Sequence, residues 1–135
     1  MLTIRMIMSQ EDKELLCRDL CARLPYNTMV QCKTDNKHKF DETLQPMHIM
    51  NFHQFDSKPY LRPMSSMTEK EKKYILDNFG VVSIKVFGGG SILPLEAAPM
   101  YIDWLNAHHF DYRGLIEKGL AIIALEWMYY SIKNE

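Results

Sequence analysis

The sequence predicts a single α+β domain, in which about three helices pack on a small, mainly antiparallel β-sheet. Two observations predict this class: apolar stripes at helical spacing that follow capping residues, and short β-rich runs separated by turns. A length of 135 residues fits one domain, and 47% hydrophobic with 24% charged residues is typical of a globular chain. We therefore expect residues 1–135 to form one domain, with residues 126–135 either part of it or a loosely ordered tail.

The first helix is predicted to begin at Ser9, whose hydroxyl can accept a backbone N–H of the first turn. Its apolar stripe at helical spacing consists of Leu16, Leu20 and Leu24. Arg18 and Arg23 are expected to lie off this stripe. Pro25 ends the helix, because proline lacks the N–H that the next turn would need.

Two strands are predicted to follow. Tyr26 to Cys32 is the first, and the second is centred on Met47 to Phe52, where side chains of alternating character fit a period of two. Residues 56–64 contain Pro59 and a second proline. Since proline cannot donate to a sheet ladder, we expect this segment to be extended and outside any central ladder.

Two further helices and a hairpin are predicted in the second half. Overlapping capping boxes at residues 66–71 begin a helix that runs to about Asn78. Two β-rich runs flank three glycines and predict a hairpin at residues 81–93. Pro99 suits the first turn of a third helix, where its missing N–H costs nothing.

Charge and hydropathy disfavour nucleic acid and membranes as partners. The formal net charge is -1, and no basic cluster is visible that could displace counterions from nucleic-acid phosphates. The longest apolar run, Leu120 to Leu125, is far shorter than a membrane helix needs. Three cysteines without a recognisable export signal favour reduced thiols. We expect a cytoplasmic protein that binds neither nucleic acid nor membrane.

The cysteines and histidines are candidate metal ligands. Cys17 and Cys21 lie one helical turn apart and could share an ion with a histidine, but structural zinc sites pair such cysteines with two histidines that can reach the same ion. On the predicted strand, His48 and His53 point to opposite faces, which is poor geometry for one ion. We therefore predict no metal and no cofactor.

The best catalytic candidates are His108, His109 and Asp111. A histidine beside a carboxylate at a helix end can act as a general base. No nucleophile in a recognisable motif accompanies them, however. The structural interpretation is that the histidines bond the last carbonyls of the third helix while Asp111 caps a short turn over residues 113–118. This second interpretation is favoured.

Binding candidates are the aromatic and arginine side chains of the C-terminal third: Trp104, Tyr112, Arg113 and Trp127. Aromatic side chains and arginine dominate the binding energy of protein–protein interfaces. A small core uses the same aromatic residues, so burial is the alternative. The tail aromatics, Trp127, Tyr129 and Tyr130, are expected to be exposed, because their segment lacks a clear periodicity.

One run, IDWLNAHHFDYRGLIEKGLAI at residues 102–122, resembles a signature of small uncharacterised proteins found in gut Bacteroidales and their phages. LCARLPYNTMVQC (residues 20–32) and PYLRPMSSMTEKEKKY (residues 59–74) are similar to further pieces of that family. Asn27 stands where the family often has glycine, and both residues can adopt the left-handed conformation. Residues 125–135 depart from the pattern. The resemblance implies a bacterial or phage setting and carries over no functional residues.

Together these observations favour a non-enzymatic accessory protein of a phage or mobile element that acts by protein–protein interaction. The alternative is a small hydrolase or nucleotide-handling enzyme that uses the region of His108, His109 and Asp111.

Overall fold

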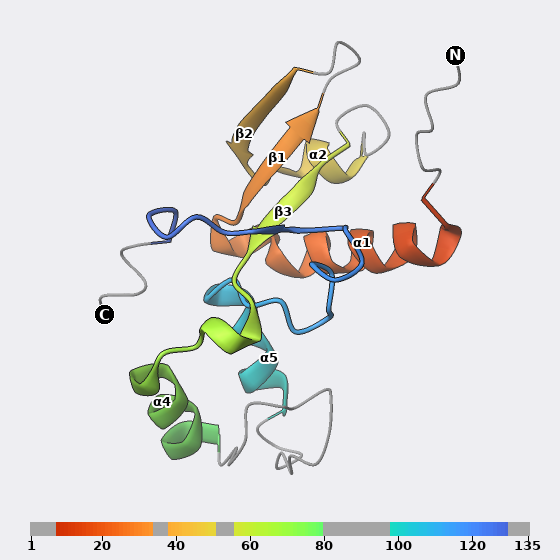
Figure 1. Cartoon of the computed structure of the whole chain (residues 1–135). Coiled ribbons are helices and arrows are strands. Elements are labelled where there is room, and N and C mark those ends of the chain that lie inside the picture. Colours follow the sequence, from red (N-terminus) through yellow and green to blue (C-terminus); the bar gives the residue numbers. More distant parts are fainter. Residues whose placement is uncertain (1–7, 34–37, 51–55, 80–97, 130–135) are drawn as a thin grey trace.

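The computed structural model describes residues 8–33, 38–50, 56–79 and 98–129 (Figure 1). The hairpin predicted at residues 81–93 and the tail aromatic Tyr130 lie outside these ranges. The elements in chain order are α1 (Gln10–Arg23), the 3-10 turn η1 (Leu24–Tyr26), β1 (Met29–Lys33), β2 (Lys39–Thr43), α2 (Pro46–Met50), β3 (Lys58–Leu61), the 3-10 turn η2 (Met64–Ser66), α4 (Glu69–Phe79), α5 (Ala98–Ala107) and β4 (Ile122–Ile123).

The strands form one sheet in the order β2-β1-β3-β4. β1 pairs antiparallel with both β2 and β3, and the short β4 pairs parallel with β3. A mainly antiparallel sheet packed with helices is the predicted α+β class, which the structure confirms. Figure 1 shows α1 running across the sheet, while α4 and α5 lie together at the end of the molecule opposite β2.

Two hydrophobic clusters fill these two parts of the fold. The first joins α1 to the sheet and the segment before β4, and its buried members include Leu16, Leu20, Val30, Leu61 and Leu115. The second lies between α4, α5 and the residues after α5, and it includes Ile75, Phe79, Tyr101, Leu105 and Phe110. Burial of apolar surface in these clusters is the main stabilising term of the fold.

The predicted helix starts are confirmed. The Ser9 hydroxyl accepts the N–H of Asp12 at 3.1 Å, and α1 ends at Arg23, two residues before Pro25. Thr68 and Glu71 form a reciprocal capping box: each side chain accepts the backbone N–H of the other, at 2.9 and 3.1 Å. A capping box satisfies two amides that the first turn cannot bond internally.

The strand predicted at Met47 to Phe52 is wrong, because residues 46–50 form the short helix α2. Pro46 suits its first turn. Leu44 and His48 are buried while Met47 and Met50 are exposed, so burial recurs every four residues instead of every two. The strand in this region is β2, which lies earlier in the chain.

Residues 58–61 are extended, as predicted, but they form the central strand β3, so the expectation that residues 56–64 lie outside any central ladder is wrong. β3 pairs with β1 at Lys58 and Pro59 and with β4 at Tyr60 and Leu61. Pro59 therefore stands where the pairing changes from one neighbour to the other. A missing N–H at that point leaves the ladder with β4 intact.

The C-terminal end of α1 also differs from the prediction. Arg23 is fully buried, although it was expected to lie off the apolar stripe. The buried positions of α1 are Leu16, Asp19, Leu20 and Arg23, a spacing that keeps one face of a helix toward the core. Arg23 tolerates this position because its Nε donates to the carboxylate of Asp19 at 2.7 Å and its Nη2 donates to the carbonyl of Phe110 at 2.6 Å.

Candidate functional site

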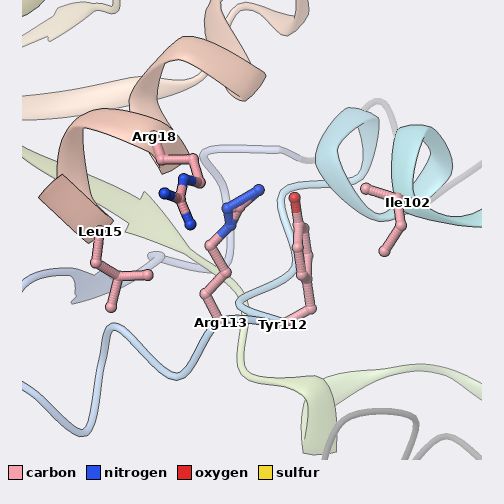
Figure 2. Close-up of a pocket in the computed structure, with 5 residues that line it drawn as sticks. All are labelled: Leu15, Arg18, Ile102, Tyr112 and Arg113. Carbon is pink, nitrogen blue, oxygen red and sulfur yellow. The ribbon is translucent and has the colours of Figure 1, made fainter. Parts of the chain in front are cut away.

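A cavity of about 520 Å³ opens between α1, α5 and the segment that follows α5. It is lined by Leu15, Arg18, Ile102, Tyr112 and Arg113 (Figure 2). Figure 2 shows the side chains of Arg18 and Arg113 reaching into the same space from different elements, with the Tyr112 ring beside them. The cavity combines two guanidinium groups with an apolar wall.

Local structure places each lining side chain. Leu15 and Arg18 are three residues apart on α1 and therefore share a face of that helix. The Tyr112 hydroxyl donates to the side-chain oxygen of Asn106, at 3.0 Å in a buried position, which fixes the ring. Arg113 follows directly in the chain, and its guanidinium lies 4.9 Å from the centre of the Tyr112 ring.

The electrostatics of the cavity favour an anion. Asp19 is fully buried, with Arg23 at 2.7 Å and the Nε of Arg113 at 3.7 Å, so one carboxylate faces two guanidinium groups. Arg18 adds a third and, within the described part of the chain, has no acidic partner. Glu14, one turn away, accepts a hydrogen bond from Gln10 instead. An incoming carboxylate or phosphate oxygen would balance this excess of positive charge.

Two of the predicted binding residues, Tyr112 and Arg113, line this cavity. Trp104 is half-buried and stacks between aromatic neighbours, with ring centres 5.8 Å from those of Tyr74 and Phe110. Trp127 is 66% exposed, as expected for the tail aromatics.

Tyr129 is buried, contrary to the expectation of exposure. Its hydroxyl donates to the carbonyl of Tyr60 and accepts the N–H of Met29, both at 2.9 Å. These two bonds connect the tail to β3 and to the start of β1. Local periodicity contains no information about such contacts with distant strands.

The three candidate catalytic side chains face different partners. His108 stacks on Trp104 with 4.1 Å between ring centres, and His109 stacks on Tyr129 at 3.7 Å. The carboxylate of Asp111 accepts the backbone N–H groups of Leu115 and Ile116, at 2.8 and 2.9 Å. Asp111 therefore caps the following turn, as the structural interpretation expected.

His109 ends α5 in a left-handed conformation, with φ of 64°. Its N–H bonds to Asn106 and the N–H of Phe110 bonds to Leu105, which is the pattern of a Schellman motif. The Nδ1 atom lies 3.1 Å from the Thr28 hydroxyl in a buried site. Burial, with Arg23, His108 and Arg62 nearby, lowers the pKa of His109 to about 3, so the ring is neutral at pH 7.

Replacement of Asp111 by alanine is expected to lower the free energy of unfolding by about 2 kcal/mol, because two backbone amides lose their acceptor. Asp111→Asn should cost less, since its amide oxygen still accepts one bond. Ser9→Ala removes an exposed cap and is the milder comparison, at about 1 kcal/mol. Urea unfolding measures all three. If Asp111→Ala leaves stability unchanged, the capping role is refuted.

The sequence gives no indication that Leu15, Arg18 and Ile102 belong to a site. Arg18 and Ile102 were placed correctly on their helices, but nothing local indicates that α1 and α5 meet at this point. The only signal was the pair Tyr112-Arg113, an aromatic ring followed by a guanidinium.

The fold and the cavity define a small α+β protein with a cavity lined by two arginines, a tyrosine and two apolar side chains. No protein-family model, curated protein or solved structure matches the chain. Among the described residues, the helices are too short or too polar to span a lipid bilayer.

Proposed function

We propose that the protein is a non-enzymatic accessory protein of a phage or mobile element in the cytoplasm of a Bacteroidales host, and that it acts by binding another protein. The observation that supports this proposal most directly is the cavity in which Arg18 and Arg113 converge beside the Tyr112 ring. The resemblance of residues 102–122 to small Bacteroidales and phage proteins supports the setting.

The chemistry of the cavity indicates which part of a partner it would hold. A guanidinium binds a carboxylate through two parallel hydrogen bonds, which gives direction as well as energy. Leu15 and Ile102 offer apolar contact to the aliphatic groups that flank such a carboxylate. The expected occupant is therefore an acidic residue of a partner protein, with an apolar residue next to it.

The alternative, a hydrolase or nucleotide-handling enzyme, requires His108, His109 and Asp111 to act on one substrate. His109 is 1% exposed, and both carboxylate oxygens of Asp111 are occupied by backbone amides. A general base must reach the proton that it removes. We therefore favour binding over this alternative.

Peptide binding tests the proposal. Fluorescence anisotropy with a labelled peptide that places Glu between leucines, and with its Gln counterpart, should show a preference for Glu that weakens with added salt. The double variant Arg18→Gln/Arg113→Gln should lose at least about tenfold in affinity, since each charge-assisted bond contributes about 1.5–3 kcal/mol. The control Lys39→Gln/Lys70→Gln removes the same charge from exposed sites on β2 and α4 and should bind normally.

Equal losses in the two double variants would show that general charge, and not the cavity, determines binding. The proposal also fails if pull-downs from a Bacteroidales lysate give no partner above background while a metabolite screen gives a tight ligand. In that case the cavity would be a small-molecule site.

A further inference from the structure

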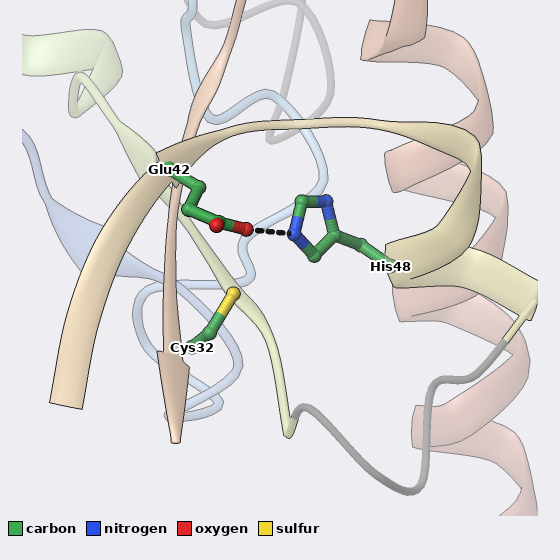
Figure 3. Close-up of side chains that lie close together, drawn as sticks. All are labelled: Cys32, Glu42 and His48. Carbon is green, nitrogen blue, oxygen red and sulfur yellow. Dashed lines mark hydrogen bonds and ion pairs between the residues drawn. The ribbon is translucent and has the colours of Figure 1, made fainter. Parts of the chain in front are cut away.

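A group of three possible metal-ligating side chains lies in the sheet half of the molecule, and the proposed function does not use it. Cys32 comes from β1, Glu42 from β2 and His48 from α2. One ligand atom from each residue lies within 4.8 Å of the other two. Figure 3 shows the three side chains converging from these separate elements, with the hydrogen bond between Glu42 and His48 drawn.

This donor set has a defined metal preference. A thiolate, an imidazole and a carboxylate are ligands of Zn²⁺, whereas Mg²⁺ and Ca²⁺ take oxygen ligands almost exclusively. Three protein ligands with a fourth position left for water is the arrangement of an open zinc site. We propose that Cys32, Glu42 and His48 bind one Zn²⁺ ion.

The distance between Glu42 and His48 requires only a small adjustment for binding. The Nε2 atom of His48 and the nearer carboxylate oxygen of Glu42 are 2.7 Å apart. A tetrahedral zinc ion bonded to both would hold them about 3.5 Å apart. Zinc therefore takes the place of the proton that joins these two atoms, after the side chains separate by roughly 1 Å.

Burial favours retention of the ion, and the exposed side chain of Glu42 gives it access. Cys32 and His48 are fully buried, while the side chain of Glu42 is 40% exposed. An ion can therefore arrive along the Glu42 side. The Ser57 hydroxyl lies 3.5 Å from the Cys32 sulfur, where it can donate a hydrogen bond to the metal-bound sulfur.

The tautomer of His48 predicts what changes on binding. Its Nδ1 atom accepts the N–H of Gln45 at 2.9 Å, so the neutral ring carries its proton on Nε2. Zinc at Nε2 displaces that proton to Nδ1, which can then no longer accept the Gln45 N–H. The thiol proton of Cys32 passes to solvent. The Gln45 amide must therefore turn away in the zinc-bound form.

Zinc titration of the full chain with a chelating dye as competitor tests the proposal. One equivalent should bind to the wild type and to Cys17→Ser/Cys21→Ser, the variant that lacks the other two cysteines. Cys32→Ser and His48→Gln should lose more than the 10–100-fold that loss of an outer-shell partner costs. Substitution with Co²⁺ should give a thiolate charge-transfer band that Cys32→Ser lacks, and the NMR signal of the Gln45 amide should shift.

Glu42→Gln separates loss of binding from loss of folding, because the half-exposed glutamine can keep the hydrogen bond to His48. Its circular dichroism without zinc should match the wild type, while zinc affinity falls by at least about tenfold. Zinc should raise the Tm of the wild type more than that of Glu42→Gln. Binding that survives in Cys32→Ser, or that is lost in Cys17→Ser/Cys21→Ser, overturns the proposal, as does a wild type that binds no zinc.

Discussion

Replacement of Asp19 by alanine is expected to destabilise the protein by about 3–5 kcal/mol, because it leaves the buried charge of Arg23 without its partner. Both side chains are fully buried, and the Nε of Arg23 lies 2.7 Å from the carboxylate. Removal of one member of such a pair is costly because the remaining ion keeps its desolvation penalty. Urea unfolding should show the loss as a lower midpoint without a change in slope.

The chain contains a matched control for this prediction. Lys73 and Asp77 form an ion pair with the same four-residue spacing, but their side chains are 77% and 54% exposed. Asp77→Ala should therefore cost less than about 1 kcal/mol. The double variant Asp19→Ala/Arg23→Met should recover part of the loss, because the fully buried charge is removed and Arg113, the other partner of Asp19, is 19% exposed. If Asp19→Ala and Asp77→Ala have equal effects, burial does not determine the strength of the Asp19–Arg23 pair.

Acidification is expected to remove roughly 4 kcal/mol of stability through His109 alone between about pH 6.5 and pH 3.5. The folded state holds the pKa of His109 at about 3, below the ordinary value of 6.5. Above pH 6.5 the ring is neutral in both states, so His109 contributes no pH dependence there. Below it, the unfolded chain takes up a proton that the folded chain does not. Stability falls by about 1.4 kcal/mol per pH unit until the folded pKa is reached.

Unfolding of the wild type and of His109→Phe at several pH values isolates this effect. Phenylalanine can keep the stack on Tyr129 but does not titrate, so the difference in stability between the two proteins should shrink as the pH falls. His38→Gln removes an exposed histidine and should keep the wild-type pH dependence. A measured NMR titration of His109 near its ordinary pKa would contradict the prediction.

Much of the fold could be predicted because it depends on short-range chemistry. The hydroxyl of Ser9, the pair Thr68 and Glu71, and the carboxylate of Asp111 all bond to amides within five residues. Such contacts can be read from spacing along the chain. The errors concern tertiary contacts. Residues 46–50 fit either a strand or a helix by pattern, and burial of His48 against the fold decides for the helix.

The candidate site could be predicted only in part, for the same reason. Tyr112 and Arg113 are adjacent in the sequence, are predicted together as binding candidates, and both line the cavity. Arg18 lies on the first helix, and its contribution depends on how α1 meets the segment after α5. The group of Cys32, Glu42 and His48 likewise arises from strand register and from an unpredicted helix. The spacing of residues along the chain indicates neither how α1 meets the segment after α5 nor which residues the strand register brings together.

The position of Tyr129 has a consequence for folding during synthesis. Its hydroxyl bridges the backbone of Met29 and Tyr60, and β4 beside it completes the sheet against β3. On the ribosome, α1, β1, β2 and β3 emerge well before this segment does. Until residues 122–129 leave the exit tunnel, β3 has an open edge and the His109 ring has no stacking partner in Tyr129. From the emergence of β3 until the emergence of β4, the nascent chain therefore exposes an unpaired strand edge, the condition under which strands from neighbouring chains pair with one another.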